Sequence, residues 1–221
     1  MNRDGTPRLE ADGLTFGYRP GEPILASWSA QFWAGTVTAL TGRSGTGKST
    51  LLYILGLMLR PQAGRVMLDG VPVQQRSDAD RAQLRAYRFG FIFQDAALDP
   101  TRTVLDNVLE TALYRRQPRR LVVAPAHALM ERFGVDLRAK HKPGQISGGQ
   151  AQRIALCRAL LGDPPVVLAD EPTGNLDPGT SRTVIDAMRE HAASGAAVVI
   201  ATHDPMVVAN CDRCIELGGV R

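Results

Sequence analysis

Cysteine is scarce in this sequence, with 3 residues in 221. So few thiols agree with a reducing compartment, where disulfides are rare. Cys157 lies within an apolar helical pattern, which indicates a small core residue. Cys211 and Cys214 form a lone C-x-x-C near the C-terminus. Because no second pair of ligands and no thioredoxin-like setting accompanies them, the pattern does not favour a metal or redox site.

Long apolar runs are also missing. A helix needs about 18 or more apolar residues to cross a bilayer, and the longest apolar run here, Leu51 to Leu59, is interrupted by Gly56. The N-terminal segment Met1 to Gly5 lacks the apolar core of a secretion signal. We therefore expect a cytoplasmic protein that reaches the inner face of the membrane only through a partner.

Neither sign of charge dominates the chain. The net charge is +4, and the acidic and basic residues are interspersed, which is typical of a solvated surface. We therefore expect no nucleic-acid partner. One dense basic patch leaves contact with nucleic acid or lipid headgroups open as a less favoured alternative. It consists of Arg115, Arg116, Arg119 and Arg120, with His127 nearby.

Short apolar runs alternate with helical patterns, which predicts an α/β fold with a largely parallel sheet. We expect strands at Leu9 to Phe16, Ser27 to Trp33, Thr36 to Thr41, Phe89 to Phe93, Val166 to Asp170 and Ala197 to Thr202. A helix is expected from Lys48 to Leu57, directly after a glycine-rich turn.

The middle of the chain has helical patterns and few strand-like runs. We expect helices at Val104 to Arg116, Ala126 to Phe133 and Gly149 to Leu161. The pattern predicts one domain, residues 1–221, in which a helical lobe (95–162) is inserted into an α/β core (1–94 and 163–221).

The strongest local motif fits the P-loop pattern G-x-x-x-x-G-K-[ST] and lies between a predicted strand and a predicted helix. Its glycines let successive backbone N–H groups point at an anion, and the helix N-terminus favours negative charge. Lys48 is placed to reach the β- and γ-phosphates of ATP, and the Ser49 hydroxyl to bind Mg²⁺. The alternative is a glycine-rich turn before an ordinary helix. The expected ATP-binding residues here are Gly42, Arg43, Ser44, Gly45, Thr46, Gly47, Lys48, Ser49 and Thr50.

A second acidic site complements the P-loop. The apolar strand Val166 to Asp170 ends in a carboxylate and is followed by Glu171. The carboxyl end of a central strand faces the ligand crevice of an open α/β sheet. Asp170 therefore suits the Mg²⁺ shell, and Glu171 suits a role in orienting or deprotonating the attacking water. The alternative is a solvated pair of acids at a strand end.

The run Ile146 to Gln150 distinguishes this sequence from other P-loop proteins. Ser147 is a good helix N-cap, and Gly148 and Gly149 leave backbone N–H groups open, so the run is a second anion-binding helix end. It resembles the signature motif of the ABC (ATP-binding cassette) ATPase family, with Ile146 in place of the commoner Leu. The resemblance implies a P-loop core with a mostly parallel sheet, an antiparallel β edge and an inserted helical subdomain. It also implies two copies stacked head to tail. Each copy's Ser147, Gly148, Gly149 and Gln150 would then close over the other's γ-phosphate.

The resemblance extends from Tyr18 to His203 in the family's order. It implies that Tyr18 stacks on adenine, that Gln94 senses metal and γ-phosphate, and that Asp177 reaches across the dimer. It also implies that His203 contacts the γ-phosphate and holds the water geometry. The implied catalytic residues are Glu171, His203, Lys48 and Gln94, and the implied metal ligands are Ser49, Gln94 and Asp170.

Two stretches, Phe89 to Gln94 and Leu168 to Asp177, are similar to the branch that serves lipoprotein release, macrolide export and cell division. The resemblance implies an ATPase that powers an exporter or extraction system through a separate membrane permease. The run Asp95 to Pro100, where the permease contact is expected, departs from that branch. The alternative is a soluble ABC ATPase without a transport role, such as an iron–sulfur assembly scaffold subunit.

Overall fold

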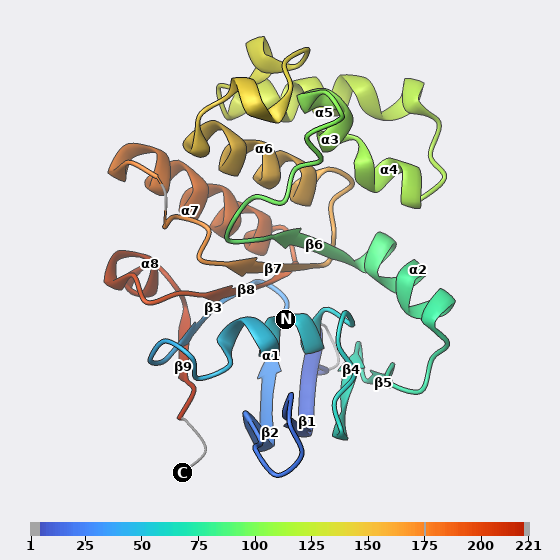
Figure 1. The fold of residues 1–221 in the computed structure, drawn as a ribbon, viewed down its shortest axis with the longest axis vertical. Coiled ribbons are helices and arrows are strands. Elements are labelled where there is room, and N and C mark those ends of the chain that lie inside the picture. The colour runs from blue at the N-terminus through green and yellow to red at the C-terminus, as the bar shows by residue number, and fades with distance from the viewer. Residues whose placement is uncertain (1–4, 175, 219–221) are drawn as a thin grey trace.

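The computed structural model describes residues 5–174 and 176–218, and its centre is a five-stranded parallel sheet in the order β6-β7-β8-β3-β9 (Figure 1). The inner strands β7 and β8 are rich in β-branched and apolar residues, and every residue of both is buried, as expected for a sheet covered on both faces. The strands of this sheet are β3 (Thr36–Thr41), β6 (Phe89–Ile92), β7 (Val166–Asp170), β8 (Ala197–Ala201) and β9 (Arg213–Glu216).

The antiparallel strands expected at the edge form a sheet of their own, in the order β2-β1-β4-β5. These strands are β1 (Leu9–Phe16), β2 (Leu25–Phe32), β4 (Ala63–Leu68) and β5 (Val71–Pro72). In β1 the register shifts between Ala11 and Leu14, where the alternation of buried residues is also interrupted. Helix α1 (Lys48–Leu55) lies between this sheet and the parallel sheet (Figure 1).

The two faces of the parallel sheet border two separate cores. Val166 and Leu168 of β7 enter the core that contains the buried leucines of α1. Val167 and Ala169 enter the opposite core, together with helix α7 (Pro178–Ala193). This alternation follows from the two-residue period of a strand. As a result, β7 is held by packing on both faces of the sheet.

Between β6 and β7 the described chain is helical, and these helices form the upper part of the molecule in Figure 1. The predicted helix at Val104 to Arg116 is in fact two helices, because the hydrogen bonding tightens to Ala112 N–Leu109 O at the junction. The division into core and lobe stays a prediction. The helices here are α3 (Val104–Val108), α4 (Glu110–Tyr114), α5 (Arg119–Arg132) and α6 (Gly148–Leu160), with 3-10 turns at Asp136–Arg138 and Pro143–Gln145.

Two further helices had no sequence expectation: α2 (Asp78–Arg88), which leads into β6, and α8 (Pro205–Ala209), which follows β8. Helix α5 begins at Arg119 rather than Ala126, and Pro125 lies inside it. Across the described ranges, no helix is both long enough and apolar enough to span a bilayer.

The basic patch does not form one continuous cationic surface. Arg115 is buried, and its guanidinium donates to the carbonyl oxygens of Ala86 at 2.5 Å and Gly162 at 2.8 Å. Arg119 is paired with Asp106 at 2.6 Å. These contacts give Arg115 a structural role and remove part of the free charge that the sequence pattern indicated.

Candidate functional site

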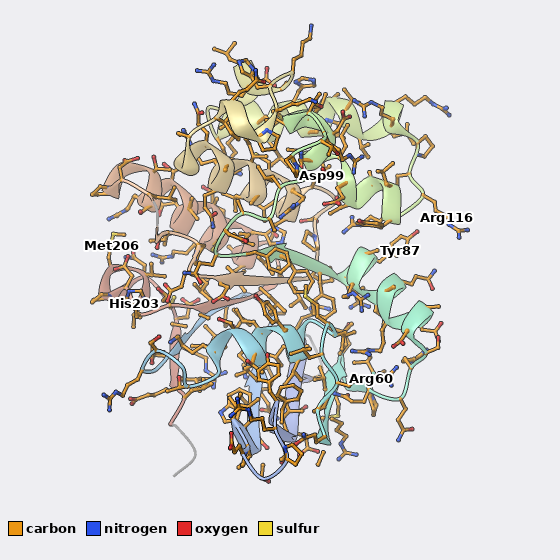
Figure 2. The ribbon with its side chains drawn as sticks, in the orientation of Figure 1. Arg60, Tyr87, Asp99, Arg116, His203 and Met206 are labelled. Carbon is orange, nitrogen blue, oxygen red and sulfur yellow. The ribbon has the colours of Figure 1, made fainter. Side chains whose placement is uncertain are left out.

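The carboxyl ends of the neighbouring strands β7, β8 and β3 open into a cavity of about 730 Å³. Chain segments far apart in the sequence meet there. His203, labelled in Figure 2, follows the carboxyl end of β8. Most of the residues proposed from the sequence for one nucleotide site are brought together in this cavity. Its lining consists of Tyr18, Ile24, Gly42, Arg43, Ser44, Gly45, Gly47, Lys48, Ser49, Thr50, Gln94, Asp170, Glu171 and His203.

The loop between β3 and α1 lines the cavity. Gly45 and Gly47 have φ angles of 81° and 93°, in the left-handed region that favours glycine. The Lys48 ammonium donates to the carbonyl oxygens of Gly42 at 2.9 Å and Arg43 at 3.3 Å, which places the cation against the loop. The first turn of α1 therefore presents free backbone N–H groups and a positive charge to the same space.

We expect Gly47→Ala to destabilise the fold by at least about 1 kcal/mol through backbone strain alone. A Cβ at this position would lie 2.3 Å from Ile24 Cγ2, so the clash adds to the strain. Gly45→Ala is the matched control, because its φ is also positive but its Cβ would meet open space. Thermal unfolding without nucleotide measures the difference. Equal losses in the two variants would contradict the role assigned to the Ile24 contact, and Ile24→Ala should partly rescue Gly47→Ala.

Asp170 is 4% exposed at the end of β7. Burial raises the pKa of its carboxyl, a hydrogen bond from Ser49 and the Lys48 charge lower it, and the neighbouring Glu171 raises it. An acid in this position is costly to ionise unless a cation accompanies it. The Ser49 hydroxyl, the Asp170 carboxylate and the Gln94 amide supply oxygen donors in one cavity, which is the ligand type that Mg²⁺ takes, so the residues fit a magnesium ion.

Glu171 is held by several contacts. Its φ angle is 44°, and its backbone N–H donates to the carbonyl oxygen of Ala201 at 2.9 Å. The Thr202 hydroxyl donates to Oε2 at 3.0 Å, and His203 Nδ1 lies 2.7 Å from Oε1. Because each carboxylate oxygen has its own partner, the orientation of the side chain is fixed. The His203 side chain is 79% exposed, so it can meet a ligand from the open side.

Tyr18 also lines the cavity and is 64% exposed. Its ring packs edge-on against Phe16 with centroids 5.1 Å apart, and its hydroxyl lies 3.3 Å from Thr50 Oγ1. These two contacts orient the ring and leave a face on which a planar base can stack.

Two further residues, Ile24 and Thr202, belong to the site but were not expected from the sequence. Ile24 lies between β1 and β2 and contacts the P-loop at Gly47, which no local pattern indicates. Thr202 is fully buried, and its hydroxyl both donates to Glu171 and accepts from the Asp204 N–H at 3.0 Å. Thr202 lies at the end of a predicted strand, next to His203, and this position could have indicated a site residue.

Some predicted site residues do not line the cavity. The Thr46 hydroxyl donates to the Arg43 carbonyl at 2.9 Å instead. Asp177 caps α7 by accepting from the Thr180 N–H, and the hydrogen bonds from Thr180 lower the pKa of the Asp177 carboxyl. Asn175, within the stretch Leu168 to Asp177, lies outside the described residues.

The run Ser147 to Gln150 also lies apart from the cavity lining. Ser147 caps α6 by accepting from the Gln150 N–H at 3.2 Å, and Gln150 Oε1 accepts from the Ser147 N–H at 2.9 Å, a reciprocal capping box. Ser147 and Gly148 are exposed, and a Cβ on Gly148 would meet nothing within 4 Å. The predicted helix cap is confirmed, and it faces open space.

A parallel sheet, a glycine-rich loop that leads into a helix at the end of β3, and an acidic pair at the end of β7 define a P-loop nucleoside triphosphatase. A family model described as ABC transporter matches residues 25–174. The chain belongs to the ABC transporter family.

Two named relatives match this chain over nearly its whole length. It is 40% identical over 221 residues to the lipoprotein-releasing system ATP-binding protein LolD of Paramagnetospirillum magneticum, covering 98% of this chain and 96% of LolD. It is 41% identical over 224 residues to the macrolide export ATP-binding/permease protein MacB 1/2 of Paracoccus denitrificans, covering 100% of this chain and 34% of that protein.

Two solved structures have the same fold. The dimeric structure of MJ0796, a bacterial ABC transporter cassette, has a TM-score of 0.89 at 31% identity and covers 95% of this chain and 94% of that one. The dimeric post-hydrolysis state of MJ0796 with ADP and Pi has a TM-score of 0.87 at 32% identity, with coverage of 95% and 94%. The chain is therefore an ATP-binding and ATP-hydrolysing subunit that powers transport.

Proposed function

We propose that two copies of this chain bind ATP between them and drive a transporter whose membrane permease is a separate polypeptide. The observation that carries the proposal is the separation of two anion-binding helix ends. One, at Lys48, lines the cavity, and the other, at Ser147, faces open space. A single nucleotide in one copy uses only the first, so the second is available to a partner's γ-phosphate.

The dimer is head to tail in this proposal, because each cavity must face the other copy's α6. Ser147 to Gln150 would then close over the partner's phosphates, and Asp177 would reach across the same interface. The dimeric state of the MJ0796 structures supports the pairing of two copies. The proposal takes the two copies as identical, which is the simplest arrangement that completes both sites.

Within one cavity, each side chain has a distinct proposed role. Tyr18 stacks on adenine, and the backbone N–H groups from Gly42 to Thr50 bind the phosphates together with the Lys48 ammonium. Ser49, Gln94 and Asp170 would hold Mg²⁺, which neutralises phosphate charge when bound. The buried Asp170 carboxylate gains a compensating cation in this way.

Glu171 and His203 act on the attacking water in this proposal. The hydrogen bonds from Thr202 and His203 aim the Glu171 carboxylate, so it can orient the water or accept its proton. The exposed imidazole of His203 stands beside this carboxylate and would contact the γ-phosphate. This pair could couple the presence of the phosphate to the orientation of the base.

A second cavity, of about 1000 Å³, lies between α2, β6 and α4, and we call it the groove. Its lining includes the stacked rings of Phe89, Phe91 and Phe93 and the exposed side chains of Tyr87 and Tyr114. We propose that an amphipathic helix of the permease occupies it, since aromatic grooves with polar rims suit such segments. The inserted lobe, residues 95–162, would provide one wall and the core the other.

If the groove binds the permease, Tyr114→Asp should reduce co-purification of the membrane chain by about tenfold or more, because it places a charge on the apolar contact surface. Tyr114 is 65% exposed, so the fold should tolerate the change. Leu137→Asp is the matched control, because Leu137 is 92% exposed and does not line the groove. Normal co-purification of Tyr114→Asp, measured in mild detergent, would contradict the placement of the permease.

The permease would hold the chain at the inner face of the cell membrane. The similarity to a lipoprotein-releasing protein and a macrolide exporter favours export or extraction of amphiphilic cargo from the membrane. A pull-down from native membranes in mild detergent, followed by identification of the co-purifying chain, tests this directly. Recovery of a membrane permease supports the proposal. Recovery of a soluble iron–sulfur assembly complex instead would favour the alternative.

A further inference from the structure

The segment after Gln94 has an unusual backbone. Ala96 and Ala97 have φ angles of 61° and 45°, so two consecutive non-glycine residues lie in the left-handed region. Side chains with a Cβ rarely adopt this conformation, and surrounding contacts must stabilise it. The segment joins the two cavities, because Gln94 lines the nucleotide cavity and Ala97 lines the groove.

Arg158 of α6 provides the stabilising contacts. Its Nη2 donates to the Ala96 carbonyl and its Nη1 to the Ala97 carbonyl, both at 2.7 Å. The planar guanidinium fork is suited to bridging two oxygens in this way. A second side chain of α6, Gln152, donates to the Phe93 carbonyl at 3.2 Å. The chain on both sides of Gln94 is therefore tied to α6, the helix that Ser147 caps.

The charge of Arg158 is balanced from the groove side. Arg158 is 6% exposed, and burial lowers the pKa of its guanidinium, while Glu110, Tyr114 and Asp95 act in the opposite direction. Glu110 Oε2 lies 3.6 Å from Arg158, and Glu110 Oε1 accepts from the Tyr114 hydroxyl at 3.1 Å. All three of Glu110, Tyr114 and Arg158 line the groove, so an occupant can reach this network.

We propose that Arg158 is a positioning residue that keeps Gln94 in the nucleotide cavity. We also propose that Glu110 makes this positioning responsive to the permease helix in the groove. The proposal rests on the functions proposed above for Gln94 and the groove. A partner side chain that is cationic or donates hydrogen bonds would compete for the Glu110 carboxylate. Arg158 would then lose its counter-charge, and the left-handed segment would relax together with Gln94.

The test compares wild type, Arg158→Lys, Glu110→Gln and Arg115→Lys in the full chain. Lysine keeps the charge but cannot bridge two carbonyl oxygens as the guanidinium does. Arg115→Lys is the matched control, since Arg115 is also buried and also bridges two carbonyls, of Ala86 and Gly162, away from the nucleotide cavity. The first readout is amide hydrogen exchange of residues 94–98, which needs no hydrolysis.

In Arg158→Lys we expect exchange in this segment to rise by about tenfold. We also expect the Mg²⁺ concentration that half-saturates ATP hydrolysis to rise by about tenfold, because Gln94 is a proposed metal ligand whose support is lost. Affinity for ATP without Mg²⁺ should stay within about twofold of wild type. Glu110→Gln should shift exchange and Mg²⁺ dependence in the same direction by a smaller factor, and Arg115→Lys should change neither.

Equal effects of Arg158→Lys and Arg115→Lys on the two readouts would reduce Arg158 to a structural residue and overturn the proposal. Unchanged amide exchange in Glu110→Gln would refute the proposed link between the groove and Gln94. Because Glu110→Gln leaves Arg158 in place, it can still be measured if Arg158→Lys does not fold. A wild-type chain and complex without Mg²⁺-dependent hydrolysis would instead refute the proposed roles at the nucleotide site. Exchange at 94–98 would still decide whether Arg158 positions the segment.

Discussion

Glu171→Gln is expected to lower the kcat of ATP hydrolysis by about a hundredfold or more while leaving ATP binding intact. Glutamine has nearly the same size, and its amide oxygen can still accept a hydrogen bond from Thr202 or His203. It lacks the negative charge and the basicity needed to orient or deprotonate water. Phosphate release measures kcat, and titration with ATP measures binding in the same preparation.

The matched control for this change is Glu190→Gln. Glu190 is an exposed acid on α7 that pairs with Arg132 and does not line the nucleotide cavity. Its neutralisation should leave kcat within about twofold of wild type. If Glu171→Gln were equally active in the assembled complex, Glu171 would not be the catalytic carboxylate.

Lys48→Ala should reduce ATP binding or turnover by at least about tenfold, equivalent to about 1.4 kcal/mol. The Lys48 ammonium lies against the Gly42 and Arg43 carbonyls at the start of α1, where it can offset the γ-phosphate charge. Alanine favours the helix, so the fold should persist.

Lys140→Ala provides the comparison for the lysine change, since Lys140 is exposed and lies outside the cavity lining. It should bind and hydrolyse ATP as wild type does. Near wild-type turnover in purified Lys48→Ala would contradict the P-loop assignment. Comparing the two variants separates loss of the phosphate contact from a general change in surface charge.

The strands and the P-loop could be predicted because their signals are local. The bounds of β1, β3 and β7 match the expected runs. β7 is a short apolar run that ends in Asp170, and in β1 and β3 apolar residues are interspersed with polar ones. The glycines and Lys48 form a contiguous motif, so their convergence on the phosphate site follows from one strand–loop–helix unit. Asp170 could be paired with it because parallel strands end at the same edge of a sheet.

The features that the sequence did not reveal depend on contacts between distant segments. Helix α2 is polar, with Arg81 as its buried residue, and Arg81 donates to the Leu57 carbonyl at 2.7 Å from a position 24 residues away. The contact of Ile24 with Gly47 and the bridge from Arg158 to Ala96 are of the same kind. Periodicity cannot detect such contacts, because they involve single side chains and backbone carbonyls.

The ATP-dependent mass of Glu171→Gln distinguishes a head-to-tail dimer from two independent copies. Light scattering during size-exclusion chromatography, with and without Mg-ATP, should show a dimer only with Mg-ATP, since slow hydrolysis preserves the γ-phosphate between the two copies. Adding Ser147→Arg should abolish the dimer by filling the space of the partner's phosphate. Because an isolated subunit can dimerise weakly, a missing dimer is followed by measuring the ATP turnover of Glu171→Gln in the assembled complex. A dimer of the isolated chain that forms without ATP, or that persists in the Ser147→Arg background, would show that the γ-phosphate does not join the two copies.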